Sequence, residues 1–135
     1  MYHHEMILKH AFDVLKNSYA PYSEFHVAAC IEVENGEYIT GVNVENASYG
    51  LSNCAERSAI FSAYTQGYRK NDIKAIAVVT RAEKITTPCG ACRQVLSELL
   101  CPDTPVILSN GKKELVTNMK ELLPFSFGQE DLTEG

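Results

Sequence analysis

Three cysteines and one glutamate, divided between two short segments, restrict the fold of this chain more than any other feature. The segments are Cys54-Ala55-Glu56 and Pro88-Cys89-Gly90-Ala91-Cys92. Three thiolates can hold one Zn²⁺ and leave its fourth tetrahedral position open, as in catalytic zinc sites. Zinc lowers the pKa of its water from 15.7 to about 7, and Glu56 is placed to move the protons. The pattern predicts a hydrolytic zinc enzyme whose fold brings the two segments together.

The composition indicates one globular domain that acts on a small, uncharged molecule. The sequence has 135 residues, of which 45% are hydrophobic and 21% charged, so it can bury a sizeable core. Its net charge is −5, whereas proteins that grip a phosphate backbone usually carry a basic face. We therefore expect no nucleic acid as the main partner.

Cysteine usage and hydropathy indicate the cytoplasm. Five cysteines, an odd number, fit metal ligands and free thiols better than a disulfide framework. No apolar run approaches a membrane span, and the N-terminus has no charged-then-apolar signal pattern, so we expect no membrane partner. We expect a single domain over residues 1–135, in which about 129–135 form a loose, acidic tail.

Apolar periodicity and turn signals predict an α/β domain. Helices are expected at about 4–19, 54–67 and 90–100, with one helical turn at 119–123, and strands at about 26–34, 37–44, 73–80, 106–109 and 115–118. Asn35-Gly36 and Asn110-Gly111 predict tight turns. Residues 73–80 are too apolar for a half-exposed strand, so this strand should be central and covered on both faces. The order predicts a three-layer α/β/α domain with a mixed five-stranded sheet.

Both cysteine segments fall at predicted helix starts, which has a physical reason. The first helical turn offers unpaired N–H donors and the positive end of the helix dipole, and both stabilise thiolates. Three thiolates on one zinc ion leave a net charge of −1. Arg57 is our first candidate for a side chain that hydrogen-bonds a ligand sulfur and offsets this charge, and Arg93 is the second.

Each part of the pattern is ambiguous by itself. The Cys89/Cys92 pair alone could be a redox pair or half of a structural zinc site, and Glu56 alone could be a solvated helix carboxylate. Together with Pro88 and Cys54, however, these residues match the zinc-deaminase signature H-x-E…P-C-x-x-C in its three-cysteine form.

Further motifs extend this match over nearly the whole chain. They are Tyr19-Ala20-Pro21-Tyr22-Ser23-x-Phe25, Gly41-Val42-Asn43-Val44-Glu45-Asn46-Ala47-Ser48-Tyr49, Asn53-Cys54-Ala55-Glu56-Arg57, Pro88-Cys89-Gly90-Ala91-Cys92-Arg93-Gln94 and Glu121-Leu122-Leu123-Pro124. On these motifs the chain resembles the small, homotetrameric, three-cysteine cytidine deaminases. The resemblance implies a zinc hydrolase of pyrimidine salvage, which converts cytidine and 2′-deoxycytidine to uridine and 2′-deoxyuridine and releases ammonia.

The resemblance also implies roles for individual residues. Cys54, Cys89 and Cys92 match the ligands of one Zn²⁺ per subunit, and Glu56 matches the proton shuttle. The substrate-binding positions are Phe25, which stacks on the ring, Asn43 and Glu45, which hold the ribose hydroxyls, and Val44 and Ala55, of which Ala55 reads the base amide edge through its backbone.

Subunit contacts follow from the same resemblance. Tyr49 and Phe127 lie near positions that reach a neighbouring subunit's pocket in a homotetramer. Phe125-Ser126 replaces the common Gly-Ala after Leu-Leu-Pro, so the C-terminal contact could differ here. Ala28-Ala29-Cys30 replaces a glycine-containing run beside Phe25, and Cys30 is expected in the strand core.

Three other functions remain open at this point. A related aminohydrolase could act on a cytosine-containing antibiotic such as blasticidin S. A nonenzymatic zinc module would need a fourth protein ligand, and none occurs at a suitable spacing. A nucleic-acid editing deaminase is disfavoured by the acidic charge balance.

Overall fold

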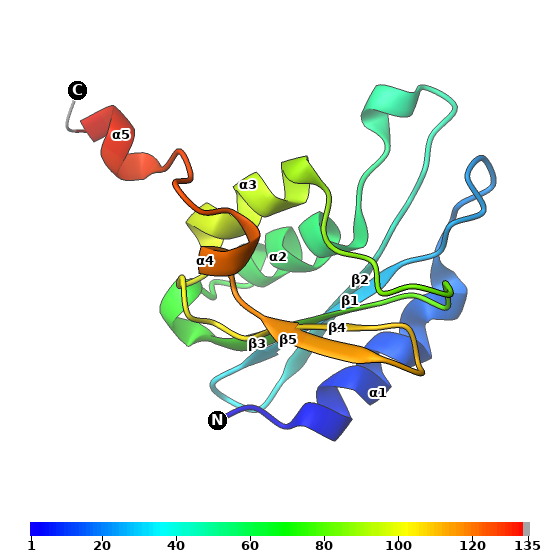
Figure 1. Cartoon of the computed structure of the whole chain (residues 1–135), viewed down its shortest axis with the longest axis horizontal. Helices are drawn as coiled ribbons and strands as arrows, with labels where there is room; N and C mark the ends of the chain where they lie inside the picture. Colours follow the sequence, from blue (N-terminus) through cyan, green and yellow to red (C-terminus); the bar gives the residue numbers. More distant parts are fainter. Residues whose placement is uncertain (134–135) are drawn as a thin grey trace.

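The computed structural model describes residues 1–133 and contains one five-stranded sheet in the order β2-β1-β3-β4-β5 (Figure 1). The strands are β1 (Ala28–Val33), β2 (Tyr38–Val42), β3 (Ile73–Val79), β4 (Val106–Ser109) and β5 (Glu114–Thr117). Only β3 and β4 pair in parallel; the other three pairs in this sheet are antiparallel. The expected mixed sheet is confirmed, and so is the central position of β3, which is buried along nearly all its length.

Helices cover both faces of the sheet and complete the expected three layers. One face carries α1 (His4–Val14), and its core joins apolar residues of α1 to Ala28, Ala77 and Ile107. The other face carries α2 (Ala55–Thr65) and α3 (Gly90–Leu99), which share a second apolar core with the sheet.

Two short helices end the described chain. They are α4 (Met119–Leu122), at the predicted helical turn, and α5 (Gln129–Thr133), which projects away from the body of the molecule in Figure 1. Residues 134 and 135, the end of the predicted loose tail, lie outside the described residues. The assignment of the whole chain to a single domain stays a prediction. Within residues 1–133, no helix is both long enough and apolar enough to cross a membrane.

Strand directions explain why distant segments meet at one edge of the sheet. Because β2 and β3 both run antiparallel to β1, and β4 runs parallel to β3, these three strands point the same way. The helices α2 and α3 follow β2 and β3, so both begin beyond the carboxyl ends of parallel strands. Ligands of open α/β sheets bind at this edge.

The first helix ends earlier than expected. It stops at Val14 and continues as a 3₁₀ turn over Leu15–Asn17, whereas apolar spacing predicted a helix to residue 19. Ser18 is already extended, and Tyr19 donates its backbone N–H to Asn43 O at 3.0 Å. This non-local pairing competes with the helix.

Glu32 is a buried carboxylate that holds the N-terminus of α1 on the sheet. Its Oε1 accepts the His3 backbone N–H at 2.8 Å, and its Oε2 lies 2.8 Å from His3 Nδ1 and 3.4 Å from Lys74 Nζ. Burial opposes the charged form, but these hydrogen bonds outweigh it and hold the pKa of Glu32 below its ordinary value.

We expect Glu32→Gln to lower the free energy of unfolding at pH 7 by about 1–3 kcal/mol, because bonds to a charged acceptor are replaced by weaker ones. The native carboxylate has the lower pKa, so its contribution is present above the unfolded value and is lost as pH falls through the folded value. The difference between wild type and variant in urea denaturation should therefore shrink between pH 6 and pH 3.

Asp13→Asn is the matched control, because Lys9 and Asp13 form an exposed pair at 2.9 Å on α1. Its free energy of unfolding should hardly change. A difference between wild type and Glu32→Gln that is constant over the whole pH range would contradict the role given to Glu32.

Gly41 allows β2 and α2 to lie in close contact. A Cβ at this position would meet Ala59 N at 2.5 Å and Ala55 O at 2.8 Å, and both are backbone atoms that cannot rotate away. Gly41→Ala should therefore lower the free energy of unfolding by about 1–3 kcal/mol through overpacking. Gly50→Ala, where nothing lies within 4 Å of the new Cβ, is the control and should melt like the wild type. Equal melting temperatures for Gly41→Ala and Gly50→Ala would show that the close contact between β2 and α2 does not require a glycine at position 41.

Candidate active site

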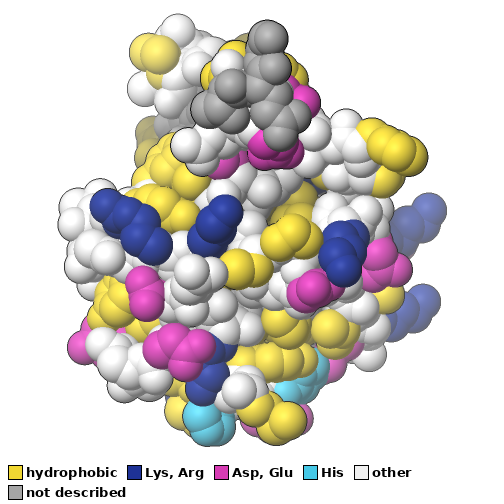
Figure 2. Space-filling model, turned by 90° about the vertical axis from the view of Figure 1, so that its left-hand side faces the viewer, with side chains coloured by type: hydrophobic (Ala, Val, Ile, Leu, Met, Phe, Trp, Pro, Cys, Tyr) yellow, Lys and Arg dark blue, Asp and Glu magenta, His cyan; other side chains and the backbone are white. Residues whose placement is uncertain are grey.

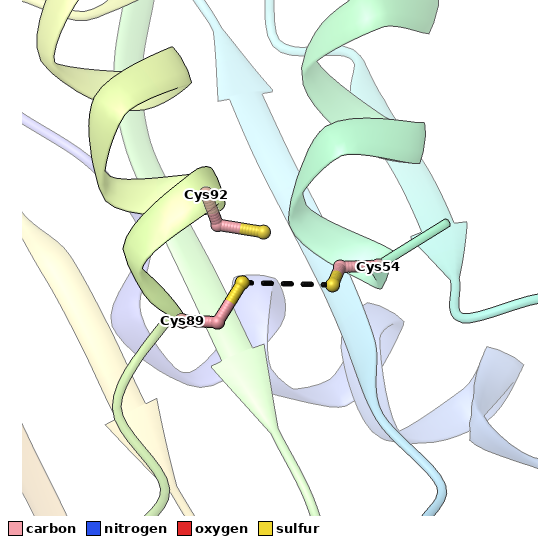
Figure 3. A group of neighbouring side chains, drawn as sticks. All are labelled: Cys54, Cys89 and Cys92. Carbon is pink, nitrogen blue, oxygen red and sulfur yellow. Dashed lines mark hydrogen bonds between the residues drawn. The ribbon is translucent and has the colours of Figure 1, made fainter. Parts of the chain in front are cut away.

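The N-termini of α2 and α3 bring the three predicted cysteines together (Figure 3). Cys54 is the N-cap of α2 and Cys89 the N-cap of α3, both with extended backbone, while Cys92 lies in the first turn of α3. Neither N-cap side chain caps the backbone N–H groups of its own helix, so both sulfurs are available to face each other. The predicted placement of cysteines at helix starts is confirmed.

The sulfur positions fit one zinc ion. The three Sγ atoms lie within 4.8 Å of one another, and those of Cys54 and Cys89 are 3.8 Å apart. Two sulfurs at 2.3 Å from a tetrahedral zinc ion are separated by roughly the same distance. Among residues 1–133 this candidate ligand cluster has three members, which leaves one tetrahedral position for a water or substrate atom.

The charge of the cluster also calls for a cation. A hydrogen bond with the Cys92 thiol, helped by Arg57 and the Cys89 thiol, lowers the pKa of Cys54 to about 5. The same hydrogen bond with Cys54, together with burial, raises the pKa of Cys92. Adjacent thiolates repel, so a bound cation would stabilise three thiolates held this close together.

Arg57, not Arg93, contacts the ligand sulfurs. The Nη2 group of Arg57 donates to Cys54 Sγ at 3.3 Å, and this bond raises the pKa of Arg57. Arg93 instead donates to Pro88 O, Leu122 O and Thr87 Oγ1, so it fastens the loop before α3. Of the two candidate arginines, Arg57 is therefore the one whose positive charge lies beside the thiolate of Cys54. Within residues 1–133, Arg57 Nε is the buried side-chain polar atom that lacks a hydrogen-bond partner.

Glu56 is a buried carboxyl beside the cysteine cluster. It lies in the first turn of α2 and is only 5% exposed. Burial raises its pKa above the ordinary value of a glutamate. A carboxyl in such surroundings accepts and releases protons nearer to neutral pH than a solvated one.

A cavity of about 260 Å³ joins Cys54 and Cys89 to most of the predicted substrate residues. Its lining residues are Ser23, Phe25, Val27, Asn43, Glu45, Cys54, Ala55, Glu56, Val78, Thr86, Thr87 and Cys89. A larger cavity of about 580 Å³ lies beside Phe12 and Arg81 and shares Phe25, but no cysteine lines it. The smaller cavity is therefore the candidate active site.

Two polar side chains in this cavity are held in place by backbone groups. Asn43 Nδ2 donates to Phe25 O at 2.7 Å, and Asn43 Oδ1 accepts from Val27 N at 3.0 Å. Glu45 Oε1 accepts from the backbone N–H groups of Tyr22 and Ser23 at 3.0 and 3.1 Å, and Oε2 accepts from the Ser23 hydroxyl. These contacts lower the pKa of Glu45, with the Ser23 hydroxyl as the largest cause.

Besides Cys92 and Arg57, which belong to the cysteine cluster, three predicted site residues do not line the 260 Å³ cavity. Val44 pairs its backbone with Asn53, and its side chain is exposed. Tyr49 is 77% exposed and lines a neighbouring cavity of about 370 Å³ with Glu45, while Phe127 is 56% exposed at the C-terminal end. The roles of these residues remain predictions.

No pattern in the sequence indicates the cavity residues Thr86 and Thr87 or the ring of polar groups around Asn43. The two threonines precede Pro88 in an irregular loop and carry no spacing that predicts a site. Ser23 stands in the motif that ends at Phe25, and the need of the Glu45 carboxylate for hydroxyl donors is the sequence signal that points to it.

Zinc content provides a test of the cysteine cluster. Cys89→Ser replaces a thiolate by a hydroxyl that remains protonated, so the bound zinc should fall from one ion per chain to well below one. Cys101→Ser is the control, because Cys101 is a half-buried free thiol after α3 that contacts Lys70 O and Asn71 Oδ1. The zinc-to-protein ratio after dialysis checks both variants, and undiminished zinc in Cys89→Ser would remove Cys89 from the ligand set.

Comparison with known proteins agrees with this geometry. Residues 1–108 match the family model described as the cytidine and deoxycytidylate deaminase zinc-binding region. Cytidine deaminase of Halalkalibacterium halodurans is 47% identical over 132 residues, which cover 96% of this chain and 98% of that protein. Blasticidin-S deaminase of Bacillus cereus is 32% identical over 112 residues, or 78% of this chain and 79% of that protein.

A solved structure shows the same fold. The crystal structure of cytidine deaminase from Burkholderia pseudomallei superposes with a TM-score of 0.87 at 47% identity and covers 94% of this chain and 100% of that one. With the three sulfurs, the buried Glu56 and these likenesses together, the chain belongs to the cytidine and deoxycytidylate deaminase family.

Proposed function

We propose that this protein catalyses the zinc-dependent hydrolytic deamination of cytidine and 2′-deoxycytidine to uridine and 2′-deoxyuridine, with release of ammonia. One observation carries the proposal: a buried carboxyl, Glu56, and two of the three clustered cysteines line the same 260 Å³ cavity. A hydrolytic site needs a source of hydroxide and a group that moves protons, and these residue types can supply both.

Cys54, Cys89 and Cys92 would hold one zinc ion in each subunit, and Arg57 would offset part of the negative charge of their thiolates. When bound, the ion makes hydroxide available at neutral pH. Arg57 acts here through the sulfur of Cys54, to which it donates.

Glu56 moves the protons of the reaction. It accepts a proton from the attacking water and delivers one to N3 of the cytosine ring, which makes C4 more electrophilic. The hydroxide that remains forms a bond to C4. Glu56 then takes the proton of the new C4 hydroxyl and delivers it to the amino group, so that the C4–N bond breaks, ammonia leaves and a C4 carbonyl forms. Burial of Glu56 excludes bulk water from these transfers, which favours a proton carried between fixed partners.

The remaining cavity residues hold the nucleoside. The ring of Phe25 would stack on the base, and the backbone of Ala55 would bind its amide edge. Asn43 and Glu45 would bind the sugar. Val44, which lies between them in the chain, pairs both of its backbone groups with Asn53 and does not line the cavity. The hydrogen-bond inventory supports the sugar assignment: after its protein contacts, Asn43 retains one N–H donor and Glu45 retains acceptor capacity on Oε2. A hydroxyl group can satisfy both at once.

We further propose a homotetramer that works in pyrimidine salvage in the cytoplasm. Exposed apolar residues support the assembly: Tyr49 and Leu51 on one loop, and Phe125, Phe127 and Leu132 on the C-terminal segment. Figure 2 shows hydrophobic side chains at the surface on the side from which that segment projects. Five cysteines without a disulfide fit a reducing compartment.

Glu56→Gln provides the test of the proton shuttle. The amide keeps the shape of the side chain but cannot carry a proton, so turnover of cytidine should fall by at least about 10²-fold while zinc stays at one ion per chain. Glu98→Gln, an exposed position on α3, is the matched control and should retain full turnover. Near-normal turnover in Glu56→Gln would refute the role of Glu56.

Blasticidin S is the competing substrate, favoured by the likeness to the Bacillus cereus enzyme. Ultraviolet absorbance can follow cytidine, 2′-deoxycytidine and blasticidin S with and without a chelator. We expect both nucleosides to react faster than the antibiotic, and we expect the chelator to stop all turnover. Faster turnover of blasticidin S would move the assignment to that substrate.

A further inference from the structure

We propose that Ser18 and His26 are positioning residues that strengthen the hydrogen bond from Asn43 to a sugar hydroxyl of the substrate. The inference rests on the proposed function, because it concerns how the same cavity recognises its nucleoside. It concerns two residues outside the cavity lining, which reach the ligand only through Asn43.

The orientation of the Asn43 side chain follows from its backbone partners. Val27 N–H must donate to an oxygen, so that oxygen is Oδ1, and Phe25 O must accept from a nitrogen, which is Nδ2. Asn43 is 8% exposed, so a reversed amide would bury two mismatched contacts. The carboxamide therefore has one orientation.

Ser18 adds a second donor to Asn43 Oδ1. The Ser18 Oγ atom lies 2.5 Å from Oδ1, which can only accept, so the hydroxyl must donate. With Val27 N–H and the Ser18 hydroxyl both bound, the two lone pairs of Oδ1 are occupied. Asn43 then has a single group left for a ligand, the second N–H of Nδ2.

His26 completes a chain of donors. Because the one hydroxyl hydrogen of Ser18 goes to Asn43, His26 Nδ1, at 2.9 Å from Ser18 Oγ, must be the donor in that contact. The hydrogen bonds thus run in one direction, from His26 through Ser18 and Asn43 to the cavity. Consecutive donors polarise one another, so the terminal N–H of Asn43 becomes a stronger donor to a sugar hydroxyl.

The test uses ligands that differ in one hydroxyl. Dissociation constants of 2′-deoxyuridine and 2′,3′-dideoxyuridine are measured by calorimetry on the zinc-loaded protein. Ser18→Ala should raise the dissociation constant of 2′-deoxyuridine by about two- to ten-fold, the range of a neutral hydrogen bond, and leave that of 2′,3′-dideoxyuridine unchanged. His26→Ala should produce a smaller loss in the same direction. Ser18→Thr, which keeps the hydroxyl, should restore the binding of 2′-deoxyuridine.

Two further measurements separate a positioning role from a structural one. Ser18→Ala should raise KM for cytidine while kcat stays within about two-fold, because the sugar contact is made before and during the reaction alike. In an Asn43→Ala background, Ser18→Ala should cause no additional loss of binding, since the effect passes through Asn43. Ser97→Ala, whose hydroxyl donates to Gln94 O on α3, is the control with no effect.

The outcomes distinguish this inference from the proposed function. Three results would overturn the inference while the proposed function stands. Ser18→Ala could weaken the binding of both ligands equally, or of neither. It could also weaken binding in the Asn43→Ala background by the same factor as in the wild type. A wild-type protein that binds neither nucleoside and does not turn over cytidine would overturn both.

Discussion

The meeting of two helix N-termini at one edge of the sheet is the constraint on which the rest of the structure depends. Three strands, β2, β3 and β4, point the same way, and the helices that follow β2 and β3 start beyond that edge. Each start carries a cysteine as its N-cap, so the sulfurs meet because the topology places the helices there. A cation held between them joins segments far apart in the sequence, and the helix dipoles favour the thiolates that hold it.

The same edge gathers the groups that we propose recognise the substrate. Asn43 follows β2 directly, and Phe25 and Val27 lie just before β1, which runs antiparallel and therefore begins at that edge. Elements of the sheet set the positions of these residues, while side-chain contacts set their orientations. The residues are thus positioned by the rigid sheet and helices, while the loops supply the side-chain contacts that can adjust.

The cysteine cluster and the three layers of this fold could be predicted from the sequence, whereas the hydrogen bonds around Asn43 could not. Helix starts at Cys54 and next to Cys89 followed from local signals, and the apolar run over residues 75–79 predicted the central place of β3. The early end of α1 could not be predicted, because Tyr19 leaves the helix to pair with residues near Val44, and periodicity carries no information on such distant pairing. The Ser18 contact with Asn43 depends on the same pairing, and Arg93 was ambiguous because only folding shows whether a guanidinium reaches sulfur or carbonyl oxygen.

The hydrogen bond from Asn43 Nδ2 to Phe25 O has a consequence for how parts of a nucleoside bind. It ties the residue proposed to hold the sugar to the main chain of the residue proposed to stack on the base. A sugar that steadies Asn43 thereby steadies Phe25, and the ordering cost is met once for both halves. Free cytosine or free ribose, bound alone, would each have to order both residues. The binding free energies of the two fragments should therefore add up to less than expected from the binding free energy of the intact nucleoside, in which one ordering step serves base and sugar together.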